Sequence, residues 1–470
     1  MHIKSMAVEN FINRLFLSTI TRQKVYIQNM NTQDTIKKTG DFIRNSATLK
    51  IVSIGILLVV LLIPTSMISS LMHERELRRN SVVQEINQKW GNNQTITGPF
   101  FTIPFKSFYK DKNDQLKFQI KYFHLLPENL KISGEIDPHV RYRSIYEAVL
   151  YNTQLTVTGN FELPSLDQLN IDPDNILWEK SIFSIGITDM RGIQENLEIT
   201  FNQQKFGVSP GLKTTDIAAA GVSSLIPLSL SETSNPFLLQ LKINGSDQIH
   251  FIPVAEETNI ELKSSWPSPS FNGAFLPTTR EVTENGFSAA WKILHLNRNF
   301  PQFWQGNQYK VNDASFGLKL LITADIYQKS IRISKYALMF IVFTFSAFFF
   351  SEIINKKRIH PIQYLLIGLA IILFYVLLLS ISEHVNFDYA YLLSSAAITF
   401  LITGYSQGIV KNKHFTITVF GILTTLYLYL YIVLQLEDYA LIMGSGGLLI
   451  VLGTIMYITR KIDWYSLENK

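Results

Sequence analysis

Cysteine is absent from this chain of 470 residues. That absence excludes a disulfide framework, thiolate metal sites, an iron–sulfur cluster, a cysteine nucleophile and lipid attachment through cysteine. Charged residues are also scarce, at 17%, where soluble domains carry roughly 25%. Any part outside the cytoplasm must hold together by packing alone, and the low charge predicts a chain that is partly soluble and partly embedded in a membrane.

Reactive signatures are missing as well. The run that starts at His73-Glu74 begins like the H-E-x-x-H zinc motif but has Leu77 where the second histidine must stand. There is no G-x-S-x-G, Walker or Rossmann motif. Lysine and arginine lie in small scattered groups without a basic stripe, which excludes nucleic acid as a partner. We therefore assign no catalytic, cofactor or metal residue and predict a protein that is not an enzyme.

Long uncharged runs are what the sequence does have. Each is long enough to cross a hydrocarbon core of about 30 Å as a helix. The first is preceded by too many residues for a cleaved signal peptide and is predicted to be an uncleaved signal anchor. The six predicted spans are Ile51–Met72, Tyr336–Asn355, Pro361–Ser382, Tyr389–Val410, Phe415–Leu436 and Tyr439–Thr459.

The short loops give these spans an orientation. Lysine and arginine stay on the cytoplasmic side, and they occur before the first span, at 356–358, at 411–413 and at 460–461. The loops at 383–388 and 437–438 contain neither residue. The pattern predicts a multi-pass protein of the bacterial inner membrane, in contact with the lipid bilayer, with both termini in the cytoplasm and residues 73–335 in the periplasm.

Residues 73–335 are expected to form a large β-rich domain. Its start, 73–90, has the apolar spacing of a helical stem, and Gly91 stands where that helix would stop. Alternating runs follow, and Leu239–Ile243, a turn at 244–247 and Ile249–Ile252 read as a hairpin. Several such strands predict an antiparallel sandwich.

The whole chain is thus divided into a cytoplasmic segment (1–50), the anchor (51–72), the periplasmic domain (73–335), a five-helix membrane domain (336–459) and a cytoplasmic tail (460–470). The first 45 residues receive no function, and Met6 or Met30 could be the true start.

Two clusters in the outer domain are candidate functional motifs. The stretch from Trp266 to Pro277, with Pro267 and Phe271, could be a binding ridge, or an ordered loop that caps the sandwich. Asp189 and Arg191 stand two residues apart and could recognise an anion, or belong to a turn held by the aspartate side chain.

Charged residues at the ends of the spans form the third group. Glu383 and His384 close the third span and could relay protons or hold a metal, or make contacts at the helix end. Glu352 precedes Lys356 by four residues, which is the favourable order for an ion pair on a helix.

These motifs together resemble a known family. The segments that carry the resemblance in the membrane part are Lys335-Tyr336-Ala337, Phe345, Phe349, Glu352, His360–Gly368, Phe374–His384, Phe387 and Ala390-Tyr391; those in the outer domain are Gly98-Pro99, Arg143–Glu147, Asp189–Gly192, Gly245-Ser246, Trp266–Pro277, Trp291 and Phe316-Gly317. In this order they closely resemble the CreD family of bacterial inner-membrane proteins. The likeness is specific from Leu49 to Tyr405 and looser over the last two spans, and Ser144 stands where the family pattern has glycine.

The resemblance implies a role in the integrity of the cell envelope, with synthesis induced in some bacteria through a sensor kinase and a response regulator. It implies no reaction and no ligand, so no catalytic residue is carried over. Other envelope proteins, lipid or glycan are candidate partners, and the oligomeric state is left open. Two other functions stay open: a transporter or lipid-handling protein that uses the C-terminal helices, and a periplasmic enzyme with an unfamiliar site.

Overall fold

The computed structural model describes residues 47–164, 171–230, 234–322, 326–355, 359–436 and 439–460. These residues form two compact units. The helical unit comprises the described residues of Met1–Arg75 and Ile326–Lys470, and the β unit comprises those of Glu76–Asp325.

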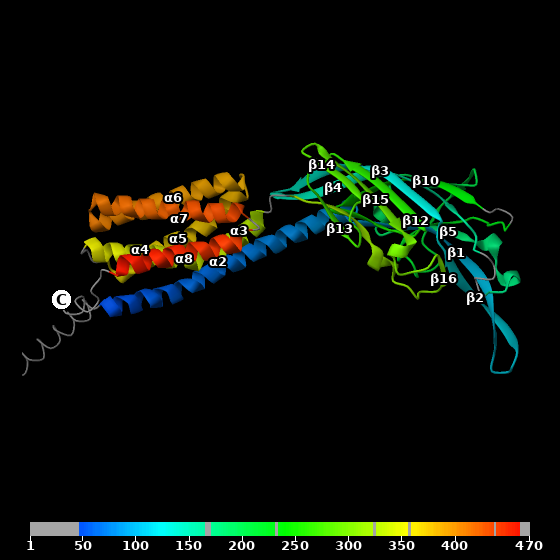
Figure 1. The fold of residues 1–470 in the computed structure, drawn as a ribbon, viewed down its shortest axis with the longest axis horizontal. Coiled ribbons are helices and arrows are strands. Elements are labelled where there is room, and N and C mark those ends of the chain that lie inside the picture. Colours follow the sequence, from blue (N-terminus) through cyan, green and yellow to red (C-terminus); the bar gives the residue numbers. More distant parts are fainter. Residues whose placement is uncertain are drawn as a thin grey trace, which may run out of the picture. The chain divides into compact units, whose positions relative to one another are not determined.

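Long apolar helices make up the helical unit (Figure 1). In chain order they are α2 (Ala47–Trp90), whose second part belongs to the β unit, α3 (Ile326–Ser334), α4 (Ala337–Asn355), α5 (Pro361–Ser382), α6 (Phe387–Val410), α7 (Lys413–Gln435) and α8 (Ala440–Thr459). The bounds of α4 to α8 follow the predicted spans closely, whereas α2 runs through both the predicted anchor and the predicted stem, and α3 has no predicted counterpart. A helix is favoured for apolar runs of this length because it pairs all its backbone groups within the segment.

Four helices in the described part of the chain, α2, α5, α6 and α7, are long and apolar enough to cross a membrane. A fifth span results if α3 and α4, which meet at a bend of 46°, are taken together. The last predicted span is represented by a shorter apolar stretch, Ile442–Tyr457. The chain is therefore a membrane protein with four or five such helices among the described residues, against the six that were predicted.

Polar residues set the ends of these helices. His360 accepts a hydrogen bond from the backbone N–H of Ile362 at the start of α5, where Pro361 occupies the first turn. Asn386 and Asn412 cap α6 and α7 in the same way. Each cap satisfies a donor that the first turn of a helix leaves unpaired.

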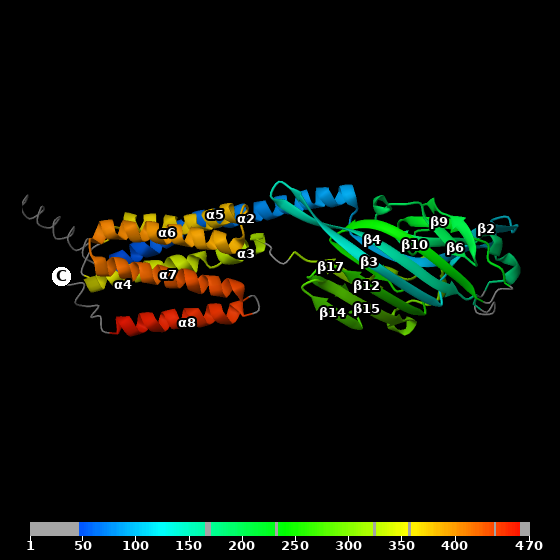
Figure 2. The ribbon, with the colours of Figure 1, turned by 90° about the horizontal axis from the view of Figure 1, so that it is seen from above.

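Two sheets form the β unit (Figure 2). In the part of the chain that the structure describes, the first has eight strands, which are, in spatial order, β14 (Thr279–Thr283), β15 (Gly286–Leu294), β12 (Glu257–Ser264), β3 (Asn129–Arg143), β4 (Tyr146–Phe161), β10 (Asn235–Ser246), β6 (Glu198–Phe201) and β7 (Gln204–Gly207).

The second sheet has nine strands among the described residues. Its main path is β13 (Pro269–Gly273), β17 (Phe316–Leu320), β11 (Gln248–Ile252), β1 (Gln94–Lys110), β5 (Ile182–Ile187), β9 (Gly221–Leu225) and β8 (Ser209–Pro210), and β2 (Leu116–Leu125) joins β1 and also pairs with β16 (Phe303–Gln305).

A phenylalanine cluster joins the two sheets face to face. The ring of Phe101 on β1 lies 4.8 Å from that of Phe161 on β4, and Phe183 on β5 lies 5.8 Å from Phe237 on β10. All four side chains are buried, and such edge-to-face contacts add to the free energy gained by removing the rings from water. The domain holds together by this packing, as a chain without cysteine must.

Two details of the predicted sandwich are wrong. The sheets are mixed, because β1 pairs in parallel with β11 and β3 pairs in parallel with β12. The predicted hairpin does not form either: β10 pairs along its whole length with β4, whereas β11 lies in the other sheet. Between them Asp247 adopts a left-handed conformation, with a φ of 62°, so the turn carries the chain from one sheet to the other.

The start of the β unit is the end of α2. The helix ends at Trp90, whose indole donates to the carbonyl of Tyr151, and Gly91 follows with a φ of 144°. A Cβ at Gly91 would lie 2.8 Å from the carbonyl oxygen of Asn244. Only glycine fits this turn, which leads directly into the polar contacts described next.

Candidate functional site

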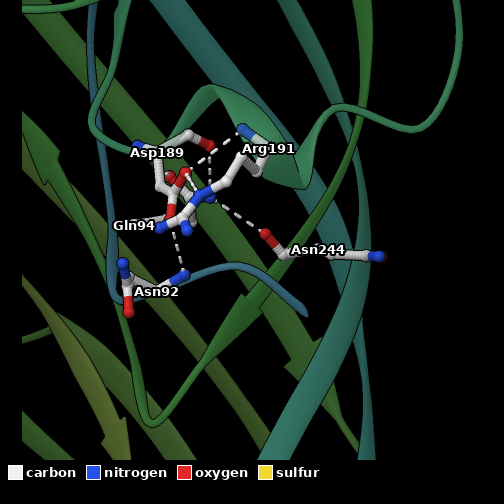
Figure 3. A network of polar contacts seen from close by, with 5 residues as sticks. All are labelled: Asn92, Gln94, Asp189, Arg191 and Asn244. Atoms are coloured by element: carbon white, nitrogen blue, oxygen red, sulfur yellow. Dashed lines mark hydrogen bonds and ion pairs between the residues drawn. The ribbon is translucent and has the colours of Figure 1, made fainter. Parts of the chain in front are cut away.

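A buried polar network surrounds Asp189 at the start of β1 (Figure 3). Asp189 precedes a single helical turn, Met190–Gly192, and its carboxylate accepts from the backbone N–H of Arg191 at 3.1 Å and of Asn92 at 3.0 Å. The guanidinium of Arg191 donates to the same carboxylate from Nε at 2.9 Å and from Nη2 at 2.7 Å. Both carboxylate oxygens are therefore occupied by groups of the protein itself.

Gln94, on β1, extends this network to the other sheet. Its side-chain amide donates to the carbonyls of Asp189 and Asn244, both at 2.9 Å, and accepts from the backbone N–H of Asp189 at 3.1 Å. A Cβ on Gly192 would lie 2.3 Å from the Asn244 carbonyl oxygen. The network thus fastens the Asp189 turn between β1 and β10, and sequence reasoning missed Gln94 because a lone glutamine carries no local signal.

The electrostatics of this network fit a structural tie. The Arg191 guanidinium, together with the backbone donors of Asn92 and Arg191, lowers the pKa of Asp189 to about 2. The carboxylate is ionised at every physiological pH, and its charge is balanced within the turn. The arrangement matches the predicted turn rather than a free anion-binding pair, because the Nε and Nη2 donors of Arg191 are already used.

The stretch from Trp266 to Pro277 is an edge strand with short flanks. β13 pairs with β17, and the indole of Trp266 donates to the carbonyl of Leu321 at 3.0 Å. The ring of Phe271 packs edge-on against Phe287 and Trp291, each at 5.8 Å. The side chains of Trp266 and Phe271 are partly buried against the core, and they form no separate ridge. Residues 269–273 form a strand where a loop was expected, whereas Pro267 lies in the irregular connection before this strand and 274–277 in the one after it.

Glu352, near the end of α4, contacts a residue far away in the sequence. Its carboxylate forms an ion pair with Lys50 of α2 and accepts from the hydroxyl of Tyr364 on α5 at 3.2 Å. The Lys50 ammonium also donates to the carbonyl of Ile359 at 2.9 Å. The predicted partner, Lys356, lies outside the described residues. Three parts of the helical unit therefore meet at one nearly buried ion pair.

Glu383 and His384, at the end of α5, are not brought together on a ligand. Glu383 accepts from the hydroxyl of Tyr327 on α3 at 3.2 Å, and the guanidinium of Arg75 on α2 lies 3.8 Å from its carboxylate. His384 is exposed. Among the described residues no group of three or more histidine, aspartate or glutamate side chains could hold a metal ion.

Helix α2 thus contacts the other helices at three levels. Lys50 pairs with Glu352, Arg75 lies beside Glu383, and between them the side chain of Leu61 fills the space above Gly368 of α5. A Cβ on Gly368 would lie 2.3 Å from Leu61, so the absent side chain lets the two helices approach. These contacts link α2 to α4 through Glu352 and to α5 through Gly368 and Glu383.

One further cluster resembles a hydrolytic site in its residue types. His124 on β2 lies 3.2 Å from the hydroxyl of Thr102 and 2.9 Å from the carboxylate of Asp216. However, His124 has no exposed surface and Thr102 only 1%, so no substrate can reach the hydroxyl. Burial lowers the pKa of His124 and favours the neutral ring. The contacts hold the segment around Asp216 onto the sheet.

A groove of about 550 Å³ follows α6 and α7 on the helical unit. Its walls are almost entirely apolar, with Leu392, Phe400 and Phe420 among them. At one end Asp388 accepts from the hydroxyl of Tyr431 at 3.0 Å. A surface of this kind is what lipid chains or another helix would cover in a bilayer.

Comparisons with known proteins agree with the resemblance seen in the sequence. The family described as "Inner membrane protein CreD" matches residues 46–465. The chain is 32% identical to the inner membrane protein CreD of Escherichia coli (strain K12) over 417 residues, which cover 87% of this chain and 91% of that protein.

A solved structure, an M1 zinc metallopeptidase from Deinococcus radiodurans, covers 35% of this chain and 38% of its own at 10% identity, with a TM-score of 0.15. This likeness is too weak to show a shared fold or function. The family match, in contrast, spans all of the described residues, both the helices and the β unit. The chain belongs to the CreD family of inner membrane proteins.

Proposed function

We propose that the protein supports the integrity of the cell envelope under stress and that it does so without catalysis, through its β unit on the periplasmic side of the membrane. The observation that carries the proposal is the place of the β unit in the chain: Glu76–Asp325 begins within α2 and ends directly before α3, so the chain connects the unit to apolar helices at both ends. Six spans, with α8 as the last, and cytoplasmic termini complete the proposed topology, supported by the distribution of lysine and arginine.

The topology predicts which added cysteine a membrane-impermeant maleimide can reach. Because the chain contains no cysteine, each variant carries one label site. In intact spheroplasts, Leu276→Cys in the β unit, at a side chain that is 67% exposed, should react. His414→Cys, exposed at the start of α7, should react only after the membrane is permeabilised. Reaction of His414→Cys in intact spheroplasts would contradict the orientation.

The non-catalytic role predicts that Glu383 and His384, the candidate residues for a proton relay or a metal site, can each be replaced without loss of function. In a strain that lacks the gene, the wild-type chain should restore growth on a bile-salt detergent, and Glu383→Gln and His384→Gln should restore it equally. The reason is that Glu383 contacts Arg75, whose side chain is 40% exposed, and that His384 is exposed as well, so neither change leaves a buried charge alone. Growth and the amount of protein in the membrane are measured together. Loss of growth at normal protein abundance would contradict this and favour an active site.

A further inference from the structure

The end of the β1–β2 hairpin extends beyond both sheets (Figure 1). Up to Phe105, which bridges to Ile176, β1 also contacts other parts of the β unit, but from Lys106 to Lys110 its one partner among the described strands is β2. In the same way β2 pairs only with β1 from Leu116 to Tyr122. We call residues 106–121 the hairpin tip.

Large apolar side chains line one face of the hairpin tip. The register places Phe108 opposite Phe118, Lys106 opposite Ile120 and Lys110 opposite Leu116, and residues directly opposite each other lie on the same side of a sheet. The exposed fractions are 48% for Phe108, 55% for Phe118, 68% for Leu116 and 41% for Ile120. Along the rest of β1 most side chains are buried. The apolar face of the tip is therefore largely uncovered by the described residues of the β unit.

Lysine surrounds this apolar face. The hairpin tip contains five lysines and two aspartates, and the aspartates form ion pairs with Lys110 and Lys117 at 2.8 and 2.6 Å. The ammonium of Lys106 lies 5.7 Å from the centre of the Phe118 ring. The tip is thus apolar at its centre and positively charged around it.

This combination matches the interface of a bilayer. Phenylalanine and leucine partition into the region where headgroups meet acyl chains, and lysine stems can lie along apolar surface while the ammonium contacts phosphate. Near an anionic surface each lysine strengthens binding about five-fold. A protein partner for the same apolar face would not need the excess of lysine. We propose that the hairpin tip docks on the anionic phospholipid surface of a bilayer, an activity that goes beyond the proposed envelope role and does not depend on it.

The test uses the full chain in phosphatidylcholine nanodiscs, mixed with vesicles of phosphatidylcholine alone or with about 30% phosphatidylglycerol. The protein should float with the anionic vesicles only, and added salt should weaken the binding. Lys106→Glu combined with Lys110→Glu should weaken it at least about 25-fold, given the five-fold effect of each lysine. Phe108→Ser combined with Phe118→Ser should lower it at least about ten-fold, because the inserted rings are lost.

Leu276→Ser and Lys263→Glu, both at exposed positions of the β unit outside the tip, are the matched controls and should bind like the wild-type chain. Far-UV circular dichroism shows that each variant is folded. Equal binding to neutral vesicles, or tip variants that bind as the wild-type chain does, would overturn the proposal. So would a photo-crosslinker on Leu116→Cys that, in native membranes, reacts with protein and not with lipid.

Discussion

Replacing Glu352 with alanine should lower the free energy of unfolding of the helical unit by about 3 kcal/mol, the low end of the range for breaking a buried ion pair. Lys50 would lose its carboxylate partner in a position where only 20% of its side chain meets water, and would keep the carbonyl of Ile359 and the ring of Tyr364 as contacts. Because Lys50 keeps this contact with water, the loss in free energy of unfolding stays at the low end of that range. Unfolding of the full chain in mixed detergent micelles, followed by the helical circular dichroism signal, gives the value.

Two further variants separate the ion pair from simple loss of packing. Tyr364→Phe removes only the hydroxyl that donates to Glu352 and should cost at most about 1 kcal/mol. The double variant Lys50→Ala with Glu352→Ala should cost clearly less than the sum of the two single changes, because neither charge is then left alone. Additive costs would show that the two side chains do not interact.

The helices could be predicted from the sequence because hydrophobicity is a local property. The bounds of α4 to α8 differ from the predicted spans by at most a few residues. The partner of Glu352 could not be predicted in the same way. The helical i, i+4 rule favours Lys356, whereas the observed partner, Lys50, lies 302 residues away.

The β unit shows the same limit. A turn at 244–247 has the same sequence signals whether the next strand pairs with the previous one or joins another sheet. Here β4 pairs with one edge of β10 along its whole length, and β6 and a bridge from Ile193 to Ile243 contact the other edge. The Trp266 stretch was predicted as a loop on account of its prolines. Pro269 is nevertheless compatible with a strand, because β13 lies at the edge of its sheet, where a missing N–H can be tolerated.

For the candidate site, too, the contacts between residues close in sequence could be predicted and the long-range contacts could not. Asp189 and Arg191 are close in sequence, so their contact could be predicted from the Asp-x-Arg spacing. The long-range contacts of Asp189, with Asn92 and Gln94, depend on how β1 enters the sheet. It is these contacts that make the residue important for stability.

Replacing Asp189 with alanine should therefore lower the free energy of unfolding of the β unit by about 3 kcal/mol, since the backbone donors of Asn92 and Arg191 would be left without an acceptor. Arg191→Ala is the matched control: its guanidinium is more than half exposed, and it should cost at most about 1 kcal/mol. Denaturant unfolding of the full chain, followed by the fluorescence of the tryptophans in the β unit, measures both. Equal costs for the two variants would contradict the role given to the backbone donors.

The same carboxylate predicts how stability depends on pH. Folding lowers the pKa of Asp189 from its ordinary value of 3.8 to about 2. The unfolded chain therefore binds the proton more readily than the folded one, and the stabilisation is fully present above pH 3.8 and is lost as the pH falls through 2. Between these values the free energy of unfolding of the wild-type β unit should fall with pH, whereas that of Asp189→Ala lacks this contribution. The difference between the two proteins should therefore shrink towards low pH. Curves that stay parallel down to pH 2 would show that Asp189 does not hold the turn through its charge.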